Sequence, residues 1–101
     1  MTIRDLIDES YNNAVDKGFF DRELSQNDLL MQIVSEVGEA YEAIRKGESL
    51  ERIAEEMADI LISCCTAIGD MEKTYGFDGF LELTHKQACN RARPYLHGKR
   101  F

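Results

Sequence analysis

Apolar residues recur at helical spacing along almost the whole chain, and this periodicity constrains the fold more than any other feature. From residue 3 to residue 71 they follow the i, i+3, i+4 pattern of amphipathic helices, and no stretch shows the alternation of a strand. Short connections force successive helices to lie roughly antiparallel. The sequence therefore predicts an all-α fold, a four-helix antiparallel bundle.

Capping residues divide this pattern into four helices. The predicted N-caps are Thr2, Ser25, Ser49 and Asp78, and the predicted ends are Gly18, Gly47, Gly76 and Pro94. The fourth helix is expected from about Gly79 to Arg93, because proline disfavours helical geometry at the residue before it, and PYLHGKRF follows as a tail. The third helix is nearly apolar all round between Ile60 and Ile68, as a central buried helix should be. In the second helix the expected core stripe contains Leu30, Val34, Val37 and Tyr41.

The length of 101 residues and the 44% hydrophobic content suit a single domain over residues 1–101. A chain this short buries a modest fraction of its surface, so help from a partner subunit is expected. No apolar run approaches the roughly 18 residues of a membrane span, and no signal peptide is recognisable. We therefore expect a cytoplasmic protein without membrane contact. The cysteines, Cys64, Cys65 and Cys89, are expected to be small buried hydrophobes in a reducing compartment.

Charge is distributed unevenly along the chain. Residues 86–101 contain five basic residues and no acid, so they carry +5. Because the net charge of the whole chain is −7, the rest of the chain carries −12. Such an acidic body repels nucleic acid, whereas a basic segment beside an acidic, metal-loaded site suits a small polyphosphate. The alternative is that the basic residues only complement a helix C-terminus.

Two acidic pairs stand among apolar residues of the second and third helices, Glu36 with Glu39 and Glu56 with Asp59. Residues three apart lie one turn apart on nearly the same face, so each pair projects together. Partly desolvated carboxylates that face one another repel unless a cation joins them, and Mg²⁺ prefers such oxygen ligands. The two pairs therefore predict a Mg²⁺ site, although E-x-x-E also occurs on solvated helix faces.

The fourth helix carries Lys86, Asn90 and Arg93 at i, i+4 and i+7, so these residues are expected to share one face. Lysine and arginine donate charge-assisted hydrogen bonds to phosphate oxygens, and an asparagine can bind a sugar or phosphate oxygen. This face is therefore a candidate phosphate-binding surface. The alternative is a solvated basic face.

Together these motifs resemble a known family. The chain contains EVGE at 36–39, 16 intervening residues, EMAD at 56–59, and K-x-x-x-N-x-x-R-P at 86–94. This combination resembles the MazG-like nucleotide pyrophosphohydrolases of the all-α NTP pyrophosphatase superfamily. The resemblance runs from about residue 26 to the closing HGKRF, which is similar to the tails of small single-domain members.

The resemblance implies hydrolysis of a nucleoside triphosphate, deoxy or noncanonical, to monophosphate and pyrophosphate, and a role in clearing unwanted nucleotides. It implies that Glu36, Glu39, Glu56 and Asp59 bind Mg²⁺, for which Mn²⁺ can substitute, and that Lys86, Asn90 and Arg93 contact the nucleotide. Glu39 is our candidate for the general base, with Glu36 or Glu55 as alternatives. The resemblance also implies a homodimer or homotetramer whose pooled helices complete the pocket.

Four aromatic residues are candidates to line a base pocket, although aromatic residues at helical spacing are more often core: Tyr11, Phe19, Phe20 and Tyr41. The chain has no tryptophan for such a pocket.

Two other readings remain open. Glu82 and His85 form an E-x-x-H motif of the kind that holds paired iron in four-helix bundles, but that scheme needs two such helices, and His97 lies in the tail. Alternatively, the domain is a non-catalytic helical interaction module with a solvated acidic surface.

Overall fold

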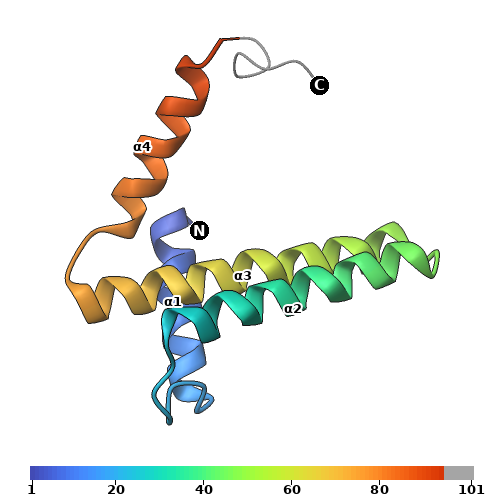
Figure 1. Cartoon of the computed structure of the whole chain (residues 1–101), viewed down its shortest axis with the longest axis horizontal. Helices are drawn as coiled ribbons and strands as arrows, with labels where there is room; N and C mark the ends of the chain where they lie inside the picture. The colour runs from blue at the N-terminus through green and yellow to red at the C-terminus, as the bar shows by residue number, and fades with distance from the viewer. Residues whose placement is uncertain (95–101) are drawn as a thin grey trace.

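The computed structural model describes residues 1–94, which form four α-helices and no strand (Figure 1). The helices are α1 (Ile3–Asp16), α2 (Gln26–Arg45), α3 (Leu50–Tyr75) and α4 (Gly79–Ala92). The all-α prediction is confirmed. The predicted tail, with His97, lies outside the described residues except for Pro94.

The four predicted N-caps are confirmed. Thr2 and Ser25 form complete capping boxes with the residues three positions later, so two exposed amides are paired at each helix start. The side chains of Ser49 and Asp78 also accept backbone hydrogen bonds in the first turns of α3 and α4. Pro94 has its expected effect, because the preceding residue, Arg93, has extended backbone with ψ of 147°.

α2 and α3 form a long antiparallel hairpin, and α1 crosses α3 (Figure 1). The crossing is close, since a Cβ added at Gly69 of α3 would lie 2.7 Å from Cβ of Tyr11. Nearby, Ile7 is fully buried, and the hydroxyl of Thr66 donates to the carbonyl oxygen of Ser10 at 3.5 Å. The absence of a side chain at Gly69 therefore allows the two helices to approach.

The predicted core stripe of α2 is wrong. Its residues Leu30, Val34, Val37 and Tyr41 are all exposed. The α2 positions that turn toward α3 lie one residue earlier, and they are Leu29, Ile33, Glu36, Ala40 and Ala43. The small alanines allow close approach of the helices, so the stripe of larger residues remains outside this contact.

A second apolar stripe is exposed on α3 and contains Leu50, Met57 and Leu61. On each helix the exposed stripe lies one residue after the positions that face the other helix, which is a rotation of about 100° around the helix axis. In an antiparallel pair, the same rotation on both helices leads to the same side of the pair. The residues Leu30, Val34, Val37, Tyr41, Ile44, Leu50, Met57 and Leu61 therefore share one side of the hairpin, which we call the apolar face. Exposure of Leu61 and Ile62 also shows that α3 is not buried all round.

α4 projects away from the other helices and contacts α3 near its own first residues (Figure 1). Gly79 is buried and Phe80 is half-buried, whereas every residue from Leu81 to Pro94 is exposed. The prediction of buried cysteines holds for Cys65 but is wrong for Cys89, which is exposed on α4. None of the helices in the part of the chain that the structure describes is long and apolar enough to cross a membrane.

Candidate functional site

Three of the four predicted carboxylates meet between α2 and α3. Glu36, Glu56 and Asp59 each offer an oxygen, and these oxygens all lie within 4.8 Å of one another. Glu36 belongs to the stripe of α2 that packs against α3, while Asp59 lies one turn after Glu56 on α3. We call these three residues the carboxylate cluster.

Glu56 is the most buried member, with 4% of its surface exposed. Its Oε1 forms an ion pair with Nη2 of Arg52, one turn earlier on α3, at 2.5 Å. Its Oε2 is buried and has no hydrogen-bond partner. A buried carboxylate oxygen without a partner is unfavourable, so this atom is available to a cation.

The carboxylate of Glu36 accepts a hydrogen bond and also lies close to other carboxylates. Gln32 donates from Nε2 to its Oε1 at 3.0 Å, one turn earlier on α2. Burial raises the pKa of the Glu36 carboxyl, and so do the neighbouring carboxylates of Glu39 and Asp59. The protein thus holds carboxylates close together although their negative charges repel one another, as expected where a cation is to be bound.

Glu39 borders the cluster rather than belonging to the group of three. It is exposed, lies close enough to Glu36 to affect its pKa, and lines a groove of about 760 Å³ with Glu56 and Arg52. Glu55, the other acid considered as a base, accepts from Nη1 of Arg52 at 3.3 Å. Its carboxylate is therefore held by Arg52, outside the carboxylate cluster.

The donor set suits a hard divalent cation. Carboxylate oxygens are the ligands that Mg²⁺ and Mn²⁺ prefer, and the unpartnered Oε2 of Glu56 faces no competing donor. Glu36, Glu56 and Asp59 are placed to hold such an ion, with Glu39 beside them. Among the residues that the structure describes, no other group of three metal-ligating side chains is this close.

The basic candidates lie apart from this cluster within one chain. Lys86 and Asn90 are exposed on α4, which projects away from the α2–α3 hairpin that carries the cluster (Figure 1). Arg93 lies one residue beyond the end of α4, in extended backbone, so helical spacing does not place it on the same face. The structure thus brings Glu36, Glu56 and Asp59 together, but within one chain it does not bring Lys86 and Asn90 to them.

A cavity of about 250 Å³ opens beside the cluster, between α1, α2 and α3. Gln32, which donates to Glu36, lines it together with Asn13, Lys17, Phe19 and Ser63. Of the four aromatic candidates only Phe19 lines this cavity. Tyr11 and Phe20 pack against each other with ring centroids 5.3 Å apart and line a different cavity, and Tyr41 is exposed on the apolar face.

The di-iron reading finds no support at Glu82 and His85. Both residues are exposed on α4, and neither belongs to a group of three metal-ligating side chains within residues 1–94.

The sequence reading missed Arg52, whose guanidinium donates a hydrogen bond to Glu55 and forms an ion pair with Glu56. The i, i+4 spacing from Arg52 to Glu56 was the available signal, because residues four apart on a helix are neighbours. It also missed Arg4 and Glu72, which are 68 residues apart yet form a bidentate pair. No local spacing could have indicated that contact.

The fold and the site define an all-α protein with a cluster of carboxylates between two antiparallel helices. Comparison with family models gives the particular family: the MazG nucleotide pyrophosphohydrolase domain matches residues 24–89, from just before α2 into α4. The chain therefore belongs to the MazG nucleotide pyrophosphohydrolase family, as its motifs indicated. Neither the curated proteins nor the solved structures gave a significant match.

Proposed function

We propose that this protein hydrolyses a nucleoside triphosphate, deoxy or noncanonical, to the monophosphate and pyrophosphate with Mg²⁺, and so removes unwanted nucleotides. The observation that carries the proposal is the unpartnered, buried Oε2 of Glu56 in a cluster with Glu36 and Asp59, in a chain of the MazG family. These features support a cation site that a triphosphate can complete.

When bound, Mg²⁺ would supply positive charge beside the triphosphate and make the attacking water more acidic. Glu36, Glu56 and Asp59 would hold the ion, and Glu39, exposed beside them in the groove, would take the proton of the water. The water oxygen bonds to the α-phosphorus, the bond from that phosphorus to the bridging oxygen breaks, and pyrophosphate leaves. Arg52 fixes the Oε1 side of Glu56, which leaves Oε2 for the ion.

Lys86 and Asn90 bind the phosphates and sugar in this proposal, with Arg93 nearby in sequence. Because α4 projects away from the cluster within one chain, we place these residues at the cluster of a second copy. The exposed apolar face of the hairpin supports such a homodimer, or a homotetramer built from it, since a surface of this kind is usually covered. The active site is then shared between protomers.

The nucleoside part of the substrate occupies the cavity between α1, α2 and α3. Gln32 links this cavity to the cluster through its hydrogen bond to Glu36, so a ligand can extend from one to the other. Amide, hydroxyl and amino groups of Asn13, Ser63 and Lys17 offer polar contacts to a base or sugar, and Phe19 offers an aromatic surface.

The proposal is tested by incubating the protein with a panel of ribo- and deoxynucleoside triphosphates, with Mg²⁺ and with EDTA, and resolving pyrophosphate from orthophosphate. Monophosphate and pyrophosphate that appear only with Mg²⁺ support attack at the α-phosphorus and identify the substrate. Orthophosphate, or no product from any nucleotide, contradicts the proposal. If Mg²⁺ and nucleotide also fail to raise the melting temperature, the non-catalytic interaction module becomes the better explanation.

A further inference from the structure

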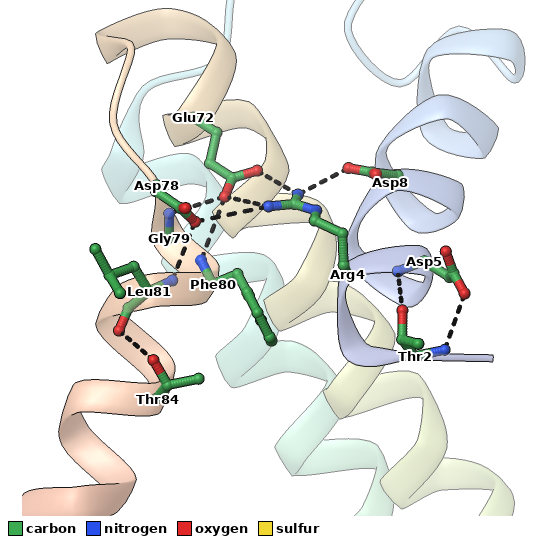
Figure 2. Close-up of polar contacts among 10 residues, drawn as sticks. All are labelled: Thr2, Arg4, Asp5, Asp8, Glu72, Asp78, Gly79, Phe80, Leu81 and Thr84. Carbon is green, nitrogen blue, oxygen red and sulfur yellow. Dashed lines mark hydrogen bonds and ion pairs between the residues drawn. The ribbon is translucent and has the colours of Figure 1, made fainter.

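The start of α4 is fixed to the body of the protein by one carboxylate, Glu72 of α3 (Figure 2). Its Oε2 accepts hydrogen bonds from the backbone amides of Gly79 at 2.8 Å and Phe80 at 3.3 Å, the first two residues of α4. Such amides have no partner inside their own helix, and a negative charge there is also favoured by the helix dipole. Glu72 therefore caps α4 from another helix.

Arg4 of α1 holds Glu72 in place. Its guanidinium donates from Nη1 to Oε2 of Glu72 at 2.9 Å and from Nη2 to Oε1, a bidentate geometry that fixes both partners. The same guanidinium donates to Asp8 at 2.7 Å and lies 3.8 Å from Oδ1 of Asp78, the N-cap of α4. The four residues Arg4, Asp8, Glu72 and Asp78 thus join α1, α3 and α4, and we call them the clamp.

Within one chain, α4 has little beyond its start to fix its direction. The contact at Gly79 is tight, because an added Cβ would lie 2.5 Å from Cγ2 of Ile68, but every residue from Leu81 to Pro94 is exposed. Lys86 and Asn90 lie two to three helical turns further along. A small rotation at the clamp therefore moves both residues by a larger distance.

We propose that Arg4 and Glu72 are positioning residues for the nucleotide: they set the direction of α4 and so place Lys86 and Asn90 at the substrate. This inference rests on the proposed function. It gives α1 a part in substrate binding, although α1 lies before the residues that match the family. The electrostatics agree with it, since the hydrogen bonds from Arg4 lower the pKa of Glu72 and so stabilise the charged carboxylate that caps α4.

The direction of α4 can be measured without any activity. Cys89 is an exposed thiol on α4, and a second one is introduced by Glu51→Cys in the first turn of α3, with Cys64→Ser to remove a half-buried thiol. Both thiols are spin-labelled, and the chain is diluted in unlabelled protein so that distances within one chain are measured. Arg4→Ala and Glu72→Gln should shift or broaden the distance distribution.

The matched control is Arg45→Ala, which removes an arginine from the exposed Arg45–Glu42 pair at the far end of α2. It should leave the distribution unchanged. Arg4→Lys keeps the charge but not the bidentate geometry, so it should restore the distribution in part. An unchanged distribution in both Arg4→Ala and Glu72→Gln overturns the inference.

Kinetics test the consequence for the substrate. Arg4→Ala should raise KM for the nucleotide about tenfold while kcat at saturation and the Mg²⁺ concentration for half-maximal activity stay near wild type, because misplaced substrate contacts weaken binding first. A loss of Mg²⁺ affinity, or a fall in kcat with KM unchanged, contradicts the positioning role. If the wild type hydrolyses no nucleotide, the proposed function fails, and the label distances still decide whether the clamp directs α4.

Discussion

At the scale of single residues, the protein places charge where water cannot stabilise it. Glu56 is buried with one oxygen paired to Arg52 and the other without a partner. The pKa of Glu36 is raised by burial and by neighbouring acids. Such an arrangement costs stability in the absence of a cation and favours binding of one. Under our proposed function, the site exchanges stability of the free chain for affinity toward a metal.

Glu56→Gln tests this exchange. The variant should lose Mg²⁺-dependent turnover by at least about 100-fold, because the cation loses its most buried ligand. Without metal it should unfold at the same or a higher temperature than wild type, since one repelling charge is removed. Glu55→Gln is the matched control on the adjacent residue and should keep most of its activity, because Arg52 holds Glu55 outside the cluster. Full activity in Glu56→Gln would refute the metal assignment.

The clamp gives a pH dependence of stability with a definite sign. Arg4 lowers the pKa of Glu72 in the folded protein below its ordinary value of 4.5, so the unfolded chain binds that proton more tightly. The stabilisation is complete above pH 4.5 and is lost as the pH falls below it. Melting temperatures from pH 7 to pH 3 should therefore decline less steeply for Glu72→Gln than for wild type. Equal slopes of melting temperature against pH would show that the Arg4–Glu72 pair does not contribute to the pH dependence of stability. The control Glu51→Gln, at an exposed acid on α3, should match wild type.

At the scale of elements, glycines decide how closely the helices approach. Gly69 of α3 lies against Tyr11 of α1, whereas nothing lies within 4 Å of the position that a Cβ would take at Gly38 of α2. Both glycines are inside helices, where alanine is intrinsically preferred. The surroundings of each glycine therefore determine whether an alanine substitution raises or lowers the stability of the protein.

Gly69→Ala should destabilise the protein by about 1–3 kcal/mol, the usual range for overpacking, because the new Cβ would lie 2.7 Å from Tyr11. Gly38→Ala should stabilise it by about 0.5–1 kcal/mol, the difference in helix propensity. Urea unfolding of both variants without metal measures the two effects. A stabilising Gly69→Ala would show that α1 can move away from α3 at little cost.

At the scale of the whole molecule, the single chain leaves two surfaces uncovered. One is the apolar face of the α2–α3 hairpin, and the other is the length of α4 beyond its start. A domain this small has a small core, so burial of the apolar face against a second copy would add considerable stability. A second copy would cover the apolar face, and in our proposal its α4 would reach the acids.

Val37→Lys should shift the protein toward monomers, because a charge at the centre of the apolar face cannot be buried without a partner. Its apparent melting temperature should fall and become less dependent on protein concentration. Sedimentation analysis measures the oligomeric state, with Ser35→Lys on the polar side of α2 as the control. A wild type that is monomeric at high concentration would contradict the assembly itself.

Mixing two inactive variants tests whether the active site is shared. If the acids of one chain work with Lys86 of another, a mixed dimer of Glu56→Gln and Lys86→Ala contains one intact site and one doubly altered site. Co-refolded equal mixtures should then recover about a quarter of wild-type activity, since half of the dimers are mixed and half of their sites are intact. No recovery would place Lys86 in the active site of its own chain.

The sequence alone determined the helices and the chemistry of the acids, because both depend on local spacing. Caps, periodicity, glycines and Pro94 fix where each helix begins and ends, and the E-x-x-E and E-x-x-D motifs place the two acids of each helix one turn apart. Tertiary structure alone decided which face of α2 is buried, because alanines allow closer approach than the larger stripe at Val34 and Val37. It also decided that α4 projects from a clamp between Arg4 and Glu72, because a contact across 68 residues depends on packing of three helices and leaves no local pattern.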